Sequence, residues 1–156
     1  MPKTKVRISK ARGLDILHIL KIGKEYHEEA KSWSIFEFDS DIAATNLAIA
    51  VEDPYQEIFI ASVGKIIVGF MWCSLGNTVF SRELVGKDLF TYVKPSLRGR
   101  GVGKELALHF EDWAAVNNVK VIITGANSGI RDNSQASAMY ENLGYHSFGL
   151  NFIKVL

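Results

Sequence analysis

The sequence predicts an α/β protein, a single domain over residues 1–156 built on a mixed β-sheet. Two observations carry this prediction. Short runs rich in Val, Ile and Phe, typical of strands, alternate with longer segments whose apolar residues recur every three or four positions, typical of helices. The chain also lacks repeats, low-complexity tracts and a Pro/Ser-rich linker at which a second domain could begin. We therefore expect the element order β-α-α-β-β-β-α-β-α-β-β.

The first half of the chain is expected to supply two helices and the antiparallel part of the sheet. Ser40 can cap the start of the second helix, and Asp41 suits its positive end. Gly64-Lys65 separates two apolar runs and indicates a hairpin. The elements expected here are a strand over residues 4–9, helices over 14–30 and 40–53, two strands within 57–75, and a strand over 88–95 that ends at Pro95.

The second half is expected to continue with two more helices. A helix is expected to follow the run of glycines that ends at Gly103 and to close at Asn117-Asn118, because its apolar residues form one face. These residues are Val102, Leu106, Phe110, Trp113 and Ala114. A nearly all-apolar strand, typical of one buried on both faces, spans 119–126. A last helix over 132–144 has Asp132 as its cap and Gly144 as its terminator, and 145–156 close the sheet as one or two strands.

Composition excludes several classes of function. Charged residues make up 22% of the chain and the net charge is +1, which counts against a nucleic-acid-binding protein or a disordered tail. Cys73 is the single cysteine, so an internal disulfide is excluded and a reducing, cytoplasmic location is expected. No apolar run reaches membrane-spanning length. The four histidines are scattered, so no metal site is expected.

A basic, glycine-rich stretch, "KPSLRGRGVGKEL", lies where the strand over 88–95 gives way to a helix. Backbone N–H groups in a first helical turn have no internal partners, and glycines let an anion approach them closely. The spacing does not fit a P-loop, because Arg98 and Glu105 stand where that motif needs Gly and Ser/Thr. It does not fit the dinucleotide-binding pattern G-x-G-x-x-G either. The stretch therefore predicts an anion site of another kind.

Two motifs in this order resemble the GNAT (GCN5-related N-acetyltransferase) family. The first is Arg-x-x-Gly-x-Gly, here the run from Arg98 to Gly103. The second is "N-x-x-A-x-x-x-Y-E-x-x-G-Y", which begins at Asn133 and ends at Tyr145. Since the strands around them also follow the family's order, the resemblance covers nearly the whole chain.

The resemblance implies that the glycine loop binds the pyrophosphate of acetyl-CoA, with no metal, and that the preceding strand hydrogen-bonds the pantetheine arm. The residues it implies for this co-substrate are Thr91, Tyr92, Val93, Arg98, Gly99, Arg100, Gly101, Val102, Gly103, Lys104, Asn133 and Tyr140. The expected reaction is acetyl transfer to a primary amine in a ternary complex.

Two residues are candidates for catalysis. Tyr140 matches the family's general acid, which protonates the departing thiolate, and the family assigns the oxyanion donor to a backbone N–H near Val93. Many family members use a Glu or Asp on or near the fourth strand as the general base, and Asp88 is the acid nearest that position in this sequence. Strand alternation places Asp88 on the face of Phe90 and Tyr92 unless a bulge intervenes, so its orientation stays open.

The acceptor is less well defined by the sequence. Residues 33–64 hold six acids and no Lys or Arg, so an acidic cleft wall that favours a cationic amine is one interpretation, and an ordinary solvated helix end is the other. Two other functions stay open, namely a non-catalytic CoA-binding or regulatory module and acyl transfer onto a nucleic acid base. Family analogy leaves a homodimer open as well.

Overall fold

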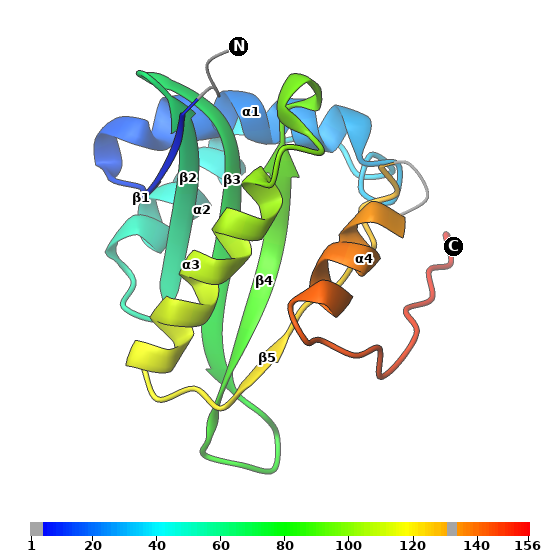
Figure 1. The fold of residues 1–156 in the computed structure, drawn as a ribbon. Coiled ribbons are helices and arrows are strands. Elements are labelled where there is room, and N and C mark those ends of the chain that lie inside the picture. Colours follow the sequence, from blue (N-terminus) through cyan, green and yellow to red (C-terminus); the bar gives the residue numbers. More distant parts are fainter. Residues whose placement is uncertain (1–4, 131–133) are drawn as a thin grey trace.

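A computed structural model describes residues 5–130 and 134–156. Its single sheet has the strand order β1-β2-β3-β4-β5, with the first four strands antiparallel and β5 parallel to β4 (Figure 1). The strands are β1 (Val6–Lys10), β2 (Gln56–Val63), β3 (Ile66–Asn77), β4 (Leu84–Val93) and β5 (Val121–Ile123). The helices are α1 (Ile16–Glu29), α2 (Ser40–Glu52), α3 (Val102–Val116) and α4 (Ser134–Asn142), with 3-10 turns at Gly13–Asp15 and Pro95–Leu97. The predicted order is confirmed from β1 to α4.

Three sequence predictions need correction or lie outside the described residues. The closing strands are absent, because residues 145–156 form neither helix nor strand and their large apolar side chains, such as Phe152, are exposed. The outer edge of β5 is only three residues long, so it offers little for another strand to pair with. The cap of α2 is Asp39, whose carboxylate accepts from the first-turn N–H groups, and Ser40 is already helical. The cap predicted at Asp132 lies outside the described residues.

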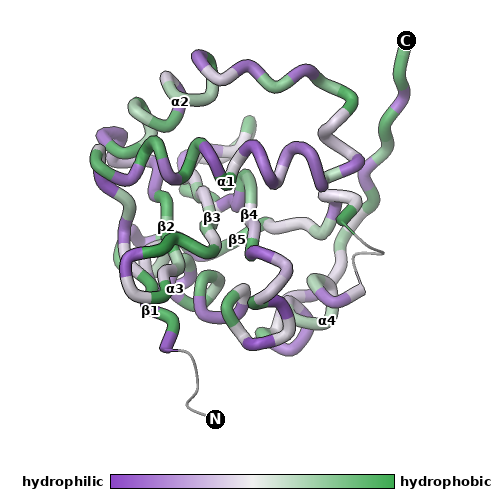
Figure 2. Tube along the Cα trace, turned by 90° about the horizontal axis from the view of Figure 1, so that it is seen from above, coloured by the Kyte–Doolittle hydropathy of each residue, from purple (hydrophilic) through white to green (hydrophobic). Residues whose placement is uncertain are grey.

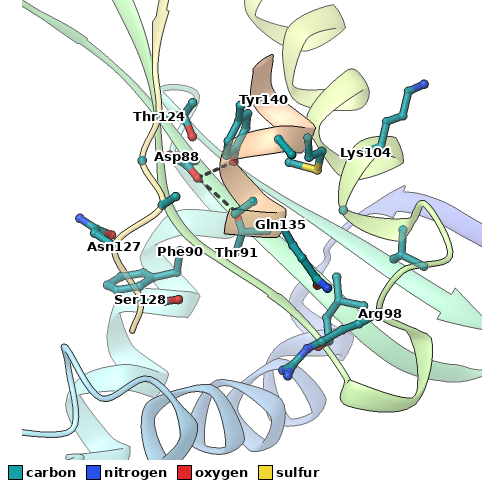
Figure 3. A pocket seen from close by; sticks show the side chains of 18 of the residues that line it. Asp88, Phe90, Thr91, Arg98, Lys104, Thr124, Asn127, Ser128, Gln135 and Tyr140 are labelled. Atoms are coloured by element: carbon teal, nitrogen blue, oxygen red, sulfur yellow. Dashed lines mark hydrogen bonds between the residues drawn. The ribbon is translucent and has the colours of Figure 1, made fainter. Parts of the chain in front are cut away.

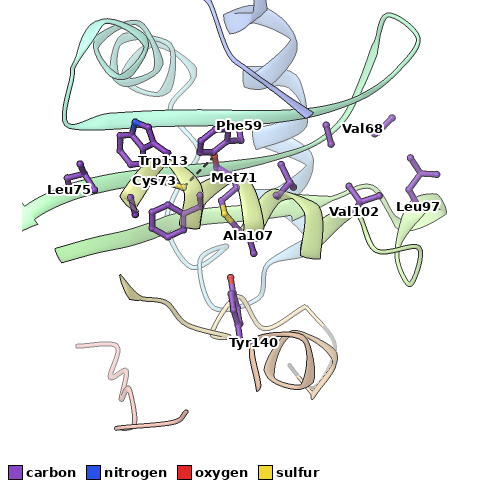
Figure 4. Close-up of a cluster of buried hydrophobic side chains, with 14 residues drawn as sticks. Phe59, Val68, Met71, Cys73, Leu75, Leu97, Val102, Ala107, Trp113 and Tyr140 are labelled. Carbon is purple, nitrogen blue, oxygen red and sulfur yellow. Dashed lines mark hydrogen bonds between the residues drawn. The ribbon is translucent and has the colours of Figure 1, made fainter. Parts of the chain in front are cut away.

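Two apolar clusters hold the helices to opposite faces of the sheet. Seen from above, α1 and α2 lie on one side of the strands, and α3 and α4 lie on the other (Figure 2). Phe110 and Leu106 of α3 pack with Met71 and Cys73 of β3 in the first cluster (Figure 4). Ile19 of α1 belongs to the second, on the α1/α2 face. Among the described helices, none combines the length and apolar character needed to cross a membrane.

Strands β4 and β5 pair over a short distance and then separate. Their register joins Val85–Lys87 to Val121–Ile123 and goes no further. Beyond Lys87 the C-terminal half of β4 therefore has a partner on its β3 side and an open edge on its β5 side. This divergence creates the gap into which α4 and the glycine loop face (Figure 1).

A β-bulge at Leu89 changes which face of the sheet the β4 side chains occupy. Trp72 of β3 pairs with Phe90, but the next residue, Cys73, pairs with Asp88, so Leu89 is an extra residue on β4. Phe90 packs in the cluster on the α1/α2 face. Asp88 instead shares the α3/α4 face, where it bonds Thr91 and Tyr140. The orientation that the sequence left open is thus decided by the bulge.

Candidate active site

The glycine loop forms a bare backbone cradle at the N-terminus of α3. Gly99 and Gly101 adopt left-handed conformations, with φ of 73° and 83°, that residues with a Cβ adopt only under strain. Gly101 is the N-cap of α3, and no side chain caps the first turn. The N–H groups of that turn therefore remain available for an anion, and the helix dipole favours negative charge there. Lys104 adds an exposed cation in the same turn.

A cavity of about 760 Å³ runs from this loop into the gap between β4 and β5 (Figure 3). Most of the residues proposed from sequence line it. They are Asp88, Thr91, Val93, Arg98, Gly99, Gly101, Val102, Gly103, Lys104 and Tyr140. The cavity continues past Asp88 to side chains that the sequence did not assign to the site, among them Phe90, Asn127 and Ser128. One continuous space therefore joins the predicted anion site to the predicted catalytic residues.

Three residues proposed for the co-substrate do not line the cavity or cannot be assessed. The Tyr92 side chain packs on the α1/α2 face, and its hydroxyl donates to Glu29 over 3.1 Å. Arg100 is exposed and lies outside the cavity lining. Asn133 lies outside the described residues.

Arg98 is held by protein groups rather than left open for an anion. Its Nη2 atom donates to Glu29 of α1 over 2.8 Å, and its Nε donates to the carbonyl of Val93 over 2.8 Å. The guanidinium also lies 5.4 Å from the ring centroid of Tyr92, a cation–π contact. Lys94 pairs with Glu25 one turn earlier on α1, over 3.4 Å. Arg98 therefore joins α1, β4 and the glycine loop as a clamp, and its contact with the co-substrate stays a prediction.

The two candidate catalytic side chains meet. The Tyr140 hydroxyl donates to the Asp88 carboxylate over 3.1 Å, and the Thr91 hydroxyl donates to the same oxygen over 3.3 Å (Figure 3). Burial raises the pKa of the Asp88 carboxyl above its ordinary value, although neighbouring hydroxyl groups lessen the rise. Burial and the Asp88 charge both raise the pKa of Tyr140. Asp88 is thereby made a stronger base, and Tyr140 stays protonated at neutral pH.

The end of α4 fixes the position of Tyr140. The chain leaves the helix in a Schellman turn, in which the Tyr145 N–H donates to the Tyr140 carbonyl and the Gly144 N–H to that of Glu141, both over 3.0 Å. This turn sets the Tyr145 ring edge-on to the Tyr140 ring, with centroids 5.2 Å apart. Tyr140 is 8% exposed, and its hydroxyl points toward the sheet (Figure 4). Its ring therefore packs in the core while its oxygen reaches Asp88.

The backbone of Val93 faces the open edge of β4. Lys94 N–H donates to the Val68 carbonyl of β3 over 2.8 Å. Because neighbouring residues of a strand direct their N–H groups to opposite sides, that of Val93 points away from β3. Its carbonyl, on the same side, is the acceptor of Arg98. The Val93 N–H thus faces the open edge of β4, and the oxyanion role that the resemblance implies for it stays a prediction.

The acidic wall predicted from residues 33–64 does not border the cavity, because none of its six acids lines it. Asp39 caps α2, Asp53 accepts from the Tyr55 N–H and from Gln56, and Glu57 pairs with Lys10 over 2.8 Å. The other three, Glu37, Asp41 and Glu52, are exposed.

Aromatic side chains stand in the cavity wall instead. Tyr26 and Trp33 line it together with Phe90. Tyr26 and Phe90 were not assigned to the site from sequence. Their signal was weak, because an aromatic residue on an amphipathic helix or strand is usually core.

Comparison with known proteins places this geometry in a family. A family model described as "Acetyltransferase (GNAT) family" matches residues 17–145. Among solved structures, that of AAC(6')-Iy in complex with a bisubstrate analogue has a TM-score of 0.79 at 17% identity, covering 97% of this chain and 99% of that one. A ribosomal-protein-alanine N-acetyltransferase from Brucella melitensis biovar Abortus 2308 has a TM-score of 0.74 at 17% identity, with 97% and 99% covered. Comparison with curated protein sequences gives no significant match.

A further solved structure, a predicted acetyltransferase from Clostridium acetobutylicum with acetyl-CoA, has a TM-score of 0.77 at 14% identity, covering 97% of this chain and 96% of that one. The family match identifies an acyltransferase, and its cavity joins the glycine loop to the hydrogen-bonded pair of Tyr140 and Asp88. The chain belongs to the GNAT family of acetyltransferases.

Proposed function

We propose that the protein transfers the acetyl group of acetyl-CoA to a primary amine by direct attack of the amine. One observation carries the proposal. The 3.1 Å hydrogen bond from Tyr140 to Asp88 sets a proton donor beside a proton acceptor, inside the cavity that begins at the glycine loop. Transfer between an amine and a thioester needs both groups, since the amine loses a proton and the departing sulfur gains one.

The residues present fit the co-substrate, which supplies the acetyl group as an activated thioester. The free N–H groups at the start of α3, with Lys104, would hold its diphosphate. The open edge of β4 from Thr91 to Val93 would hydrogen-bond the pantetheine arm in the manner of an added strand. The Val93 N–H would donate to the carbonyl oxygen as negative charge develops there.

Asp88 and Tyr140 would move the protons as a pair. Asp88 takes the proton that the amine loses as its nitrogen bonds to the acetyl carbon. Tyr140 gives its hydroxyl proton to the sulfur as the carbon–sulfur bond breaks, and regains a proton from Asp88 across their hydrogen bond. Both groups end the turnover in the state in which they began it. The raised pKa of Asp88 suits a general base, because it moves the pKa of the carboxyl toward the working pH. The raised pKa of Tyr140 makes it a weaker acid but keeps its hydroxyl protonated, so that a proton is present to donate.

The binding half of the proposal can be tested with a charge reversal. Lys104→Glu should weaken acetyl-CoA binding by roughly tenfold in calorimetry, or about 1.4 kcal/mol, because it sets a carboxylate against the diphosphate. Lys65→Glu, at the exposed β2–β3 turn, is the matched control and should bind normally. Equal affinity for both variants would remove the cradle from the proposal.

The catalytic half can be tested by thiol release with a panel of amines. Tyr140→Phe keeps the ring and removes the donor, so kcat should fall by about 10²- to 10⁴-fold while acetyl-CoA binding is unchanged. An unchanged kcat would assign Tyr140 to packing. Binding of acetyl-CoA without thiol release for any amine would favour a non-catalytic CoA-binding module.

A further inference from the structure

The end of the cavity away from the glycine loop has a rigid aromatic wall. Tyr26 of α1 meets Phe90 of β4 edge-to-face, with ring centroids 5.7 Å apart at an interplanar angle of 67°. Trp33, which follows α1, meets Phe90 in the same way at 5.8 Å and 75°. Edge-to-face contacts of this kind fix ring orientation as well as position. The wall therefore presents a preformed apolar surface.

A neutral loop also borders this end of the cavity. Asn127 and Ser128, which follow β5, line the cavity beside Phe90 (Figure 3). The Ser32 N–H donates to the Ser128 carbonyl over 3.2 Å, so the segment after α1 and the loop after β5 are joined here. A Cβ at Gly129 would lie 2.8 Å from the Ser32 hydroxyl, which shows how closely the two segments approach. The loop after β5 is therefore held against the segment after α1.

Among the described residues, a single position brings negative charge to the cavity lining. Of the described residues that line the cavity, Asp88 alone carries a carboxylate. The nearest acids of α1, Glu25 and Glu29, are paired with Lys94 and Arg98. One ammonium group can thus be matched by a carboxylate, and any further ammonium would be buried against apolar or neutral groups at a large cost.

We propose that the acceptor is a small monoamine carried on an aromatic frame, of the arylalkylamine class, whose ring packs on Tyr26, Trp33 and Phe90 while its amine faces Asp88. This inference rests on the proposed function and names its substrate. Ring burial favours such an amine over a purely aliphatic one, and the single carboxylate disfavours polyamines and aminoglycosides.

Acceptor preference tests the proposal directly. At saturating acetyl-CoA, kcat/KM from thiol release should be at least about tenfold higher for phenethylamine and tryptamine than for spermidine or neamine. The preference should persist as ionic strength rises, because it rests on ring burial rather than on long-range attraction. A preference for spermidine or neamine that declines with salt would overturn the inference and leave the proposed function standing.

Substitutions in the aromatic wall test whether Trp33 contacts the acceptor. Trp33→Ala should lower kcat/KM for phenethylamine by about tenfold or more, Trp33→Phe should restore most of it, and acetyl-CoA binding should stay unchanged in both. Phe36→Ala is the control, because this ring packs against Trp33 but lies outside the cavity lining. Equal losses in Trp33→Ala and Phe36→Ala would overturn the assignment of the wall.

A binding measurement separates this inference from the proposed function. Phenethylamine should quench tryptophan fluorescence in the wild type and fail to do so in Trp33→Phe. If phenethylamine binds in this way but no amine is acetylated, the acetyl-transfer proposal fails while the assigned ligand class stands. If phenethylamine neither binds nor reacts while spermidine is acetylated, the inference alone fails.

Discussion

Replacing Arg98 with methionine would remove a guanidinium that joins three parts of the molecule. It binds Glu29 on α1 and the Val93 carbonyl at the end of β4, and it stands at the start of the glycine loop. Methionine keeps an apolar stem to cover Tyr92. We therefore expect Arg98→Met to lower stability, and to change acetyl-CoA affinity by less than about threefold, or roughly 0.7 kcal/mol.

The size of the effect follows from the exposure of the pair. Exposed ion pairs contribute about 0–1 kcal/mol, whereas hydrogen bonds to charged groups contribute about 1.5–3 kcal/mol. The Arg98 and Glu29 side chains are 15% and 31% exposed, so solvent screens them only in part. We take about 1.5 kcal/mol for the pair and about 1 kcal/mol for the bond to the Val93 carbonyl. The total of about 2.5 kcal/mol corresponds to a fall in Tm of roughly 5–10 °C for a chain of this size.

A double-mutant cycle measures this quantity. Thermal unfolding of the wild type, Arg98→Met, Glu29→Gln and the double variant should give a coupling energy near 1.5 kcal/mol. Lys120→Met is the control, because Lys120 pairs with Glu83 at 78% and 69% exposure and its loss should cost under about 1 kcal/mol. A coupling below about 0.5 kcal/mol, together with a more than tenfold loss of acetyl-CoA affinity in Arg98→Met, would refute the clamp and return Arg98 to the diphosphate.

Two further predictions concern Asp88 and Gly129. Because burial raises the pKa of Asp88, this group stays protonated to a higher pH than an ordinary carboxyl, so kcat/KM should fall with decreasing pH through an apparent pKa above 3.8. Asp88→Asn should abolish this acidic fall in kcat/KM and lower the rate by about 10²- to 10⁴-fold. Asp112→Asn, on the exposed side of α3, should keep both the pH dependence and the rate. An unchanged pH dependence in Asp88→Asn would exclude Asp88 as the base. Gly129→Ala should lower stability by at least about 1 kcal/mol in thermal unfolding, because φ is +73° and Ser32 lies against the new Cβ. Gly23→Ala, at an open position within α1, should raise stability by up to about 1 kcal/mol. Stability changes of the same sign in Gly129→Ala and Gly23→Ala would contradict the close approach at Ser32.

Local signals account for what the sequence predicted well. The helix that follows the glycine loop, its end at Asn117 and the terminator Gly144 each depend on residues within a few positions of one another. The place of the glycine loop at a strand-to-helix turn was predicted for the same reason, whereas its binding of acetyl-CoA stays a prediction.

The parts that sequence reasoning missed depend on contacts between distant segments. Arg98 and Glu29 are 69 residues apart, so the clamp appears only when α1 is packed beside the end of β4. A spacing signal was nonetheless present, because Glu25 and Glu29 on α1 are four residues apart, as are Lys94 and Arg98. The prediction of closing strands over residues 145–156 was wrong for a related reason. The alternating pattern of residues 145–156 is strand-like, but a strand also needs a partner edge, and three residues of β5 supply little of one.

The extra residue at Leu89 divides β4 into two halves of opposite parity. Before it, even-numbered side chains such as Leu84 and Asp88 face α3 and α4, and after it the odd-numbered Thr91 and Val93 do so. The strand can therefore place an ionisable group in the cleft from one half and, from the other, keep Phe90 on the α1/α2 face. A one-residue change in length within either half would move the side chains beyond it to the opposite face of the sheet. Residue count, as much as residue identity, decides which groups an amine would meet in this cleft.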